Sequence, residues 1–235
     1  MIEFIPLGEV GRRFEGQRRV RLSDAGVDGL LRADGLVRYL QDVATDDWED
    51  TDAGTNDTWV VRRTSMRVSA SGRWPRLGER VTLTTWCGGL GAAWAERRTN
   101  ILVDDHLLLE AVALWVPIDP AGRPRRIGPR FLDIYGTAAA GRRVPGRVAV
   151  TAPGPGAIRR PWPIRRADMD VVGHANNAAL WTALTDVTDE PVRDASFTHH
   201  AGVDGDDAVE LVSQANQLWL EVQGVVRVSG EFRVG

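Results

Sequence analysis

Residues 164–190, IRRADMDVVGHANNAALWTALTDVTDE, are the stretch from which the fold and the function of the chain are interpreted. They predict the end of a strand, a tight polar turn, and then a short helix that is apolar on most sides. Such a helix has to be covered, most simply by a curved sheet. Its start would then be partly buried, with the carboxylate of Asp170, the imidazole of His174 and the carboxamide of Asn176 near free backbone N–H groups. This combination suits the binding of a polarised carbonyl group.

The composition excludes several classes of protein. A net charge of -3 and a pI near 5.8 argue against nucleic-acid binding, which needs a basic surface. The single cysteine, Cys87, excludes an internal disulfide and a cysteine-based zinc site, and we interpret it as a buried, inert thiol. The first residues lack the apolar core of a signal peptide, and no apolar run is long enough to span a bilayer. We therefore expect a cytoplasmic protein with no stable membrane insertion.

The first half of the chain predicts one α+β unit. A helix is expected from Asp34, because Leu36, Leu40 and Val43 recur on one face. Glycines, prolines and an Asp-Asp pair then separate four strand-like runs, namely Trp59–Ser69, Glu79–Cys87, Ala92–Val103 and Leu107–Pro117. A helix followed by long antiparallel strands allows the sheet to curl around the helix.

Residues 119–158 differ from this pattern and predict a linker rich in proline and arginine. Eight of the twelve prolines fall between residues 119 and 166, together with eleven arginines. We expect this linker to lie over a surface without a core of its own. Two interpretations remain open: a solvated connector, or a basic face for an acidic partner.

Residues 159–235 repeat the order of the first half, with a strand, a helix and further strands. A gapless alignment of the two halves places Asp170 on Asp28, His174 on Arg32 and Asn176 on Asp34. Two copies of one small unit, at 1–118 and 159–235, make the economical architecture. Only the second copy carries histidine and asparagine at the start of its helix.

Three segments together resemble the acyl-[acyl carrier protein] thioesterases of the plant and bacterial type. They are WVVRRTSMRVSASGRWPRLGERVTLTTW (59–86), AVALWVPIDPAGRPRRIG (111–128) and DMDVVGHANNAALW (168–181). The resemblance covers nearly the whole chain and implies an α+β fold, a tandem (double) hotdog in which each antiparallel sheet wraps a central helix. It implies an acyl-chain and specificity half at 1–118 and a catalytic half at 159–235.

The resemblance also implies the site residues. Asp170 matches the active-site carboxylate of the family, His174 its histidine, and Asn176 the first asparagine after it. The chain departs from the family pattern at two places. Val172 stands where the family has an asparagine, and His200 and Ala201 stand where the family has a Glu-Cys pair. We expect catalytic roles for Asp170, His174, Asn176 and His200, and substrate contacts from Gly173, Trp181, Leu36, Leu40 and Met66. Asp170 and Asn176 have an alternative role as helix caps.

In this family the implied reaction is hydrolysis of fatty acyl thioesters of acyl carrier protein during fatty acid biosynthesis, without a metal or cofactor. The implied partner is the carrier protein with its phosphopantetheine-linked acyl chain. Five arginines would suit the phosphate or the acidic carrier, namely Arg123, Arg125, Arg126, Arg159 and Arg160. The alternatives are an acyl-CoA thioesterase and a non-hydrolytic acyl-binding protein. Either a monomer or a homodimer is compatible with a double hotdog.

Overall fold

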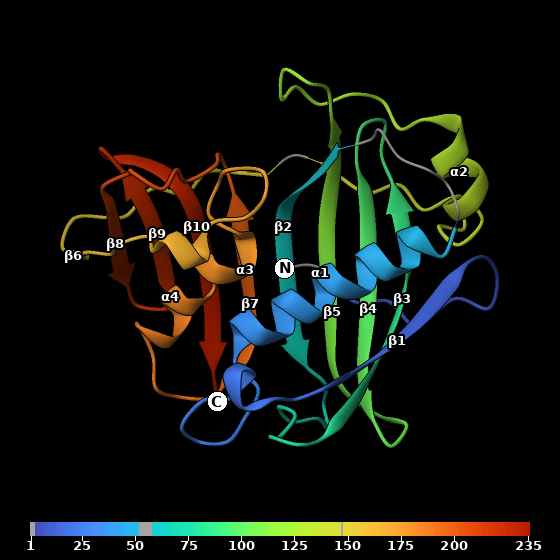
Figure 1. Cartoon of the computed structure of the whole chain (residues 1–235), viewed down its shortest axis with the longest axis horizontal. Coiled ribbons are helices and arrows are strands. Elements are labelled where there is room, and N and C mark those ends of the chain that lie inside the picture. The colour runs from blue at the N-terminus through green and yellow to red at the C-terminus, as the bar shows by residue number, and fades with distance from the viewer. Residues whose placement is uncertain (1–2, 52–57, 147) are drawn as a thin grey trace.

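The structure, a computed structural model, describes residues 3–51, 58–146 and 148–235 (Figure 1). Over these residues ten strands form one antiparallel sheet in the order β1-β3-β4-β5-β2-β7-β10-β9-β8-β6. The strands are β1 (Arg13–Arg19), β2 (Thr58–Val68), β3 (Arg80–Leu90), β4 (Ala95–Val103), β5 (His106–Ile118), β6 (Ile158–Pro161), β7 (Val192–His199), β8 (Val209–Gln214), β9 (Gln217–Val222) and β10 (Val225–Val234). The helices are α1 (Ala33–Glu49), α2 (Pro129–Tyr135), α3 (Asn177–Leu180) and α4 (Thr182–Thr185), with 3-10 turns η1 (Leu22–Asp24) and η2 (Arg166–Asp168).

In the first half, α1 lies across the inner face of β1, β3, β4, β5 and β2 (Figure 1). The predicted apolar face of the helix is buried there, with Leu36 and Val43 fully buried and Leu40 7% exposed. Burial of one such side chain contributes about 1.5 to 3 kcal/mol, so packing holds this helix against the sheet. The helix predicted from Asp34 is confirmed, one residue longer at its start.

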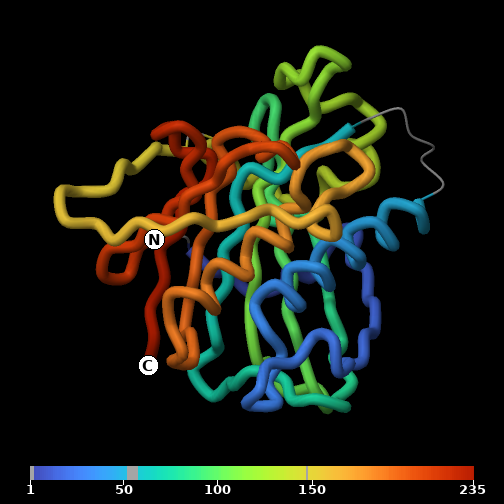
Figure 2. Tube along the Cα trace, turned by 60° about the vertical axis from the view of Figure 1, so that its left-hand side comes forward, coloured from blue at the N-terminus to red at the C-terminus, as the bar shows by residue number. Residues whose placement is uncertain are grey.

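In the second half, α3 and α4 form a shorter, interrupted helix against the inner face of β7, β10, β9 and β8 (Figure 1). Trp181, between the two helices, is fully buried and stacks on Phe197 of β7 with ring centroids 4.0 Å apart. The two halves share one sheet, because β2 pairs with β7 from Arg63 opposite Thr198 to Arg67 opposite Asp194. In both views the two helical elements lie on the same side of that sheet (Figures 1 and 2).

The repeat is real, but its register differs by two residues from the sequence alignment. In each copy a 3-10 turn precedes a loop that is closed by a backbone hydrogen bond, from Gly26 to Leu30 and from Asp170 to His174. Gly29 and Gly173 occupy the same position of this loop, both with positive φ. Asp170 therefore corresponds to Gly26, His174 to Leu30 and Asn176 to Arg32. The alignment with Asp28, Arg32 and Asp34 was wrong because it matched aspartates, whereas the backbone conformation depends on the glycine.

The segment between the halves contains a helix that the linker prediction missed. α2 begins with Pro129 at its first position, and its side chains Phe131 and Tyr135 are buried against Cys87 and Ala95. The segment therefore covers part of the first half through this helix, which packs on β3 and β4. None of the helices in the described part of the chain is both long and apolar enough to cross a membrane.

Candidate active site

The turn before α3 is held by its own backbone. The Asp170 N–H donates to the His174 carbonyl at 2.9 Å, and the Gly173 N–H donates to the Asp170 carbonyl at 3.1 Å. One carboxylate oxygen of Asp170 accepts the Val172 N–H at 2.9 Å. Gly173 has φ +90, which favours glycine. Gly173, from which we expect a substrate contact, therefore has its N–H engaged within the turn.

His174 is oriented by an acid from another loop. Its Nδ1 lies 2.7 Å from an oxygen of Asp204, and the two side chains are 51% and 56% exposed. The ring passes over Gly202, where a Cβ would lie 2.9 Å from Nδ1. A carboxylate on Nδ1 fixes the tautomer and leaves Nε2 for proton transfer. Sequence reasoning did not identify Asp204, which is 30 residues away.

The two asparagines have different positions. The Asn176 side chain caps α3 by accepting the Ala178 N–H at 2.8 Å, and the Asn176 N–H donates to Asp168 at 2.7 Å. The helix-cap role is therefore the one that the contacts of Asn176 support. Asn177, the second asparagine of the motif, lines a cavity between α1 and the sheet together with Gln41 and Thr64.

The histidine pair at the end of β7 separates across the sheet. His200 Nε2 lies 2.9 Å from the Ser229 hydroxyl, on the face away from the helices. The structure therefore does not bring His200 together with His174. His199 faces inward and is buried, and this burial lowers its pKa to about 3, so its imidazole is neutral at pH 7. Strand alternation separates the two histidines but does not tell which one faces inward.

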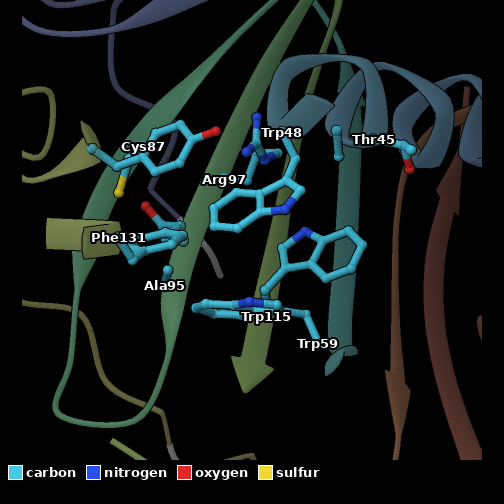
Figure 3. Close-up of a pocket in the computed structure, with 11 residues that line it drawn as sticks. Thr45, Trp48, Trp59, Cys87, Ala95, Arg97, Trp115 and Phe131 are labelled. Atoms are coloured by element: carbon cyan, nitrogen blue, oxygen red, sulfur yellow. The ribbon is translucent and has the colours of Figure 1, made fainter. Parts of the chain in front are cut away.

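Two neighbouring cavities follow α1 along the sheet. The inner one, of about 20 Å³, is lined by Asn177 and Leu40 among others. The outer one, of about 190 Å³, has mostly aromatic walls (Figure 3). Its aromatic residues are Trp48, Trp59, Trp115, Phe131 and Tyr135, and Arg97 and Trp115 line both cavities. Of the predicted substrate contacts, Leu40 lines the inner cavity, whereas Leu36, Met66 and Trp181 are buried in the core and line neither.

The outer cavity presents little net charge. The Arg97 guanidinium lies 2.6 Å from Asp47, which is also bound by Arg12 at 2.7 Å. Burial raises the pKa of Tyr135 to about 12 and that of Cys87 to about 11, so both are neutral at pH 7. The sequence showed the tryptophans but not their convergence, because they come from α1, β2 and β5.

Comparison with known proteins confirms the expected fold. A protein of Lactobacillus plantarum assigned as an oleoyl thioesterase superposes with a TM-score of 0.80 at 18% identity, covering 97% of each chain. The 12:0-ACP thioesterase from Umbellularia californica gives 0.77 at 17% identity, covering 97% of this chain and 100% of that one. These likenesses show the double hotdog fold.

Comparisons of the amino-acid sequence identify relatives of the chain in addition to its fold. The uncharacterized protein Rv2001 of Mycobacterium tuberculosis is 25% identical over 72% of this chain and 67% of its own length. The family described as "Acyl-ACP thioesterase N-terminal domain" matches residues 11–135, which is more than half of the 235 residues. The chain therefore belongs to the acyl-ACP thioesterase family.

Proposed function

We propose that this protein hydrolyses thioesters of acyl groups carried by acyl carrier protein and releases the free fatty acid. The observation that carries the proposal is the path of the two cavities. They run along α1 from the aromatic residues to Asn177, and Asn177 belongs to the same segment as Asp170 and His174. An apolar slot whose inner end is lined by the segment that carries an acid and an oriented imidazole fits an acyl chain with a hydrolysable end.

The geometry of α1 sets the length of chain that fits. From Val37 to Trp48, the helix residues that line the two cavities, α1 rises about 16 Å at ~1.5 Å per residue. An extended backbone advances about 3.5 Å per three bonds, so 16 Å accommodates about 14 bonds. The proposed substrate is therefore a medium to long acyl chain with its thioester near the start of α3.

In the proposed reaction Asp170 acts as the base for an attacking water, or attacks the thioester carbon directly. With water, the new C–O bond forms as the proton passes to the carboxylate, and the C–S bond breaks to release the pantetheine thiolate. The Nε2 of His174, whose Nδ1 is held by Asp204, relays the proton taken up by Asp170 to that thiolate, which restores the carboxylate. Asn176 contributes by capping α3, which fixes the backbone between Asp170 and Asn177.

The arginines proposed for carrier binding have to be weighed against their contacts within the chain. Arg159 pairs with the buried Glu221 at 2.6 Å, Arg123 pairs with Asp119 at 2.9 Å, and Arg160 bonds the carbonyl of Asp186. A phosphate would have to compete with these groups for the three arginines.

The test is the release of free thiol from an acyl-ACP, compared with the CoA ester of the same acyl chain. We expect wild type to turn over the acyl-ACP, and Asp170→Asn to lose roughly 100- to 10,000-fold in kcat. A strong preference for CoA would instead support the acyl-CoA thioesterase. Equal, very slow hydrolysis by wild type and Asp170→Asn would support a non-hydrolytic acyl-binding protein, as would the engaged Gly173 N–H.

A further inference from the structure

Three polar side chains from three different elements meet at the inner cavity, whose wall is otherwise mostly apolar. Gln41 comes from α1, Thr64 from β2 and Asn177 from the start of α3. Within residues 3–51, 58–146 and 148–235, the carboxamides of Gln41 and Asn177 and the hydroxyl of Thr64 form no hydrogen bond. The inner cavity therefore offers polar groups that are still available to a ligand.

These three groups can be reached from the cavity or its mouth. In the described part of the chain, the polar atoms that are both sealed and unpartnered include the Trp115 indole of the same wall, but no atom of Gln41, Thr64 or Asn177. Gln41 and Asn177 are half-buried, so their carboxamides are neither enclosed in the core nor fully in water. Half-buried amides that remain accessible suit the recognition of a ligand oxygen.

Gln41 also interrupts the apolar side of α1. The residues of α1 that line the two cavities recur with the helical period, and they are Val37, Leu40, Gln41, Ala44, Thr45 and Trp48. The hydroxyl of Thr45 has its own acceptor, the Gln41 carbonyl at 3.1 Å. The Gln41 carboxamide has none, although loss of water without a new partner destabilises the folded protein. A residue that breaks the local pattern at such a cost indicates a functional position.

The two carboxamides lie where the proposed function puts the reacting carbonyl. Asn177 is the first residue of α3, and α3 contacts α1 (Figure 1). In a helix the Cα–Cβ bonds tilt toward the N-terminus, so the Gln41 side chain extends toward Val37, which lines the same cavity. The volume of this cavity, about 20 Å³, holds one small polar group such as a water molecule or a carbonyl oxygen.

We propose that Gln41 and Asn177 are catalytic residues whose carboxamide N–H groups bind the carbonyl oxygen of the thioester, with the Thr64 hydroxyl beside them. This inference rests on the proposed function and names further residues of the same site. When the water oxygen bonds to the carbonyl carbon, the π electrons of the C=O bond move onto the oxygen. The N–H donors stabilise that negative charge, and the C–S bond breaks when the electron pair returns. The first copy of the fold would thus supply a catalytic group to the motif of the second.

The kinetic experiment compares Gln41→Met, which removes the N–H group at similar length, with Gln41→Glu, which keeps the shape but has no N–H. Loss of one oxyanion donor typically lowers kcat by about 100- to 1,000-fold, and we expect this loss for Gln41→Met. KM should change by less than about threefold, because the contact strengthens mainly in the transition state. Gln41→Glu should lose more, because its carboxylate repels the oxyanion, and Asn177→Asp should lose kcat for the same reason. The control is Gln17→Met, the same substitution at an exposed position of β1 outside both cavities, which should keep the kcat of wild type.

A second measurement detects the contact without hydrolysis. It uses a ketone analogue of the acyl-ACP in which a methylene group replaces the thioester sulfur and the carbonyl carbon carries an isotope label. Infrared difference spectroscopy follows the C=O stretch, which moves to lower wavenumber when the oxygen accepts hydrogen bonds. We expect a lower wavenumber on wild type and on Gln17→Met than on Gln41→Met or Asn177→Asp.

Two outcomes would overturn the inference. One is a Gln41→Met protein that is folded in urea titrations and keeps the kcat of wild type, and the other is a carbonyl stretch that neither Gln41→Met nor Asn177→Asp changes. Failure of the proposed function would appear separately, as the absence of thiol release by wild type. The infrared shift of the bound ketone would still decide whether the two carboxamides bind the carbonyl oxygen.

Discussion

Filling the aromatic cavity from α1 should shorten the acyl chain that the protein accepts. Ala44 lines this cavity and is 8% exposed, so Ala44→Phe would place a ring in the space assigned to the end of the chain. From Ala44 to Trp48 the helix rises about 6 Å, which corresponds to about five bonds of an extended chain. At about 0.8 kcal/mol for each buried methylene, the lost contact is worth at most about 4 kcal/mol.

In kinetic terms this is a loss of up to about a thousandfold in kcat/KM. The assay measures kcat/KM for acyl-ACP esters of increasing chain length. For wild type we expect values that rise with length until the cavity is full, and for Ala44→Phe the rise should stop about five carbons earlier. Short esters should be hydrolysed by both proteins at the same rate.

The matched control is Ala33→Phe, which changes the same residue type in the same helix outside both cavities. Urea unfolding of both variants shows whether the ring is accommodated, since overpacking of a filled core costs about 1 to 3 kcal/mol. A folded Ala44→Phe with the chain-length profile of wild type would refute the placement of the acyl chain.

Three further predictions concern stability and reactivity. Asp47→Asn removes the fully buried partner of two arginines and should lower the free energy of unfolding by about 3 to 5 kcal/mol in urea titrations; a loss below 1 kcal/mol would contradict the assigned ion pairs. The pKa of His199 is about 3 in the folded protein and near 6.5 in the unfolded chain. Between these two pH values the unfolded chain binds one proton more than the folded protein. The free energy of unfolding therefore falls as the pH falls below 6.5, by up to about 1.4 kcal/mol per pH unit. His199→Phe should flatten that dependence between pH 6.5 and 4, and an unchanged slope would show that another group causes it. Cys87 is buried and its thiol pKa is raised to about 11, so iodoacetamide should label it only when the protein is unfolded, as mass spectrometry would detect; rapid labelling in buffer would contradict this burial.

The regular elements of the first half were predictable because their sequence pattern matches their burial. Leu36, Leu40 and Val43 recur with the helical period and all face the sheet. α2 was not predicted, because its surroundings are rich in glycine, proline and arginine and only Phe131 and Tyr135 reveal its buried face. Seven residues are too few for a periodic signal.

The candidate site was predictable only in part, because its parts depend on long-range contacts. The motif located Asp170, His174 and Asn176 in one segment, whereas the partner of His174 comes from a separate loop. The inward position of His199 depends on how β7 pairs with β2 and β10, which sequence spacing leaves open. The aromatic cavity likewise depends on the order of the strands in the sheet.

The central claim is that the acyl chain lies along α1 and ends among the aromatic residues. The direct measurement uses carrier protein bearing an acyl chain with a diazirine at its last carbon, attached through an amide that cannot be hydrolysed. After irradiation, mass spectrometry should find the chain end on Trp48, Trp59 or Phe131, which line the outer cavity. Attachment to the second half, for example near Trp219, or to surface residues alone would contradict the account.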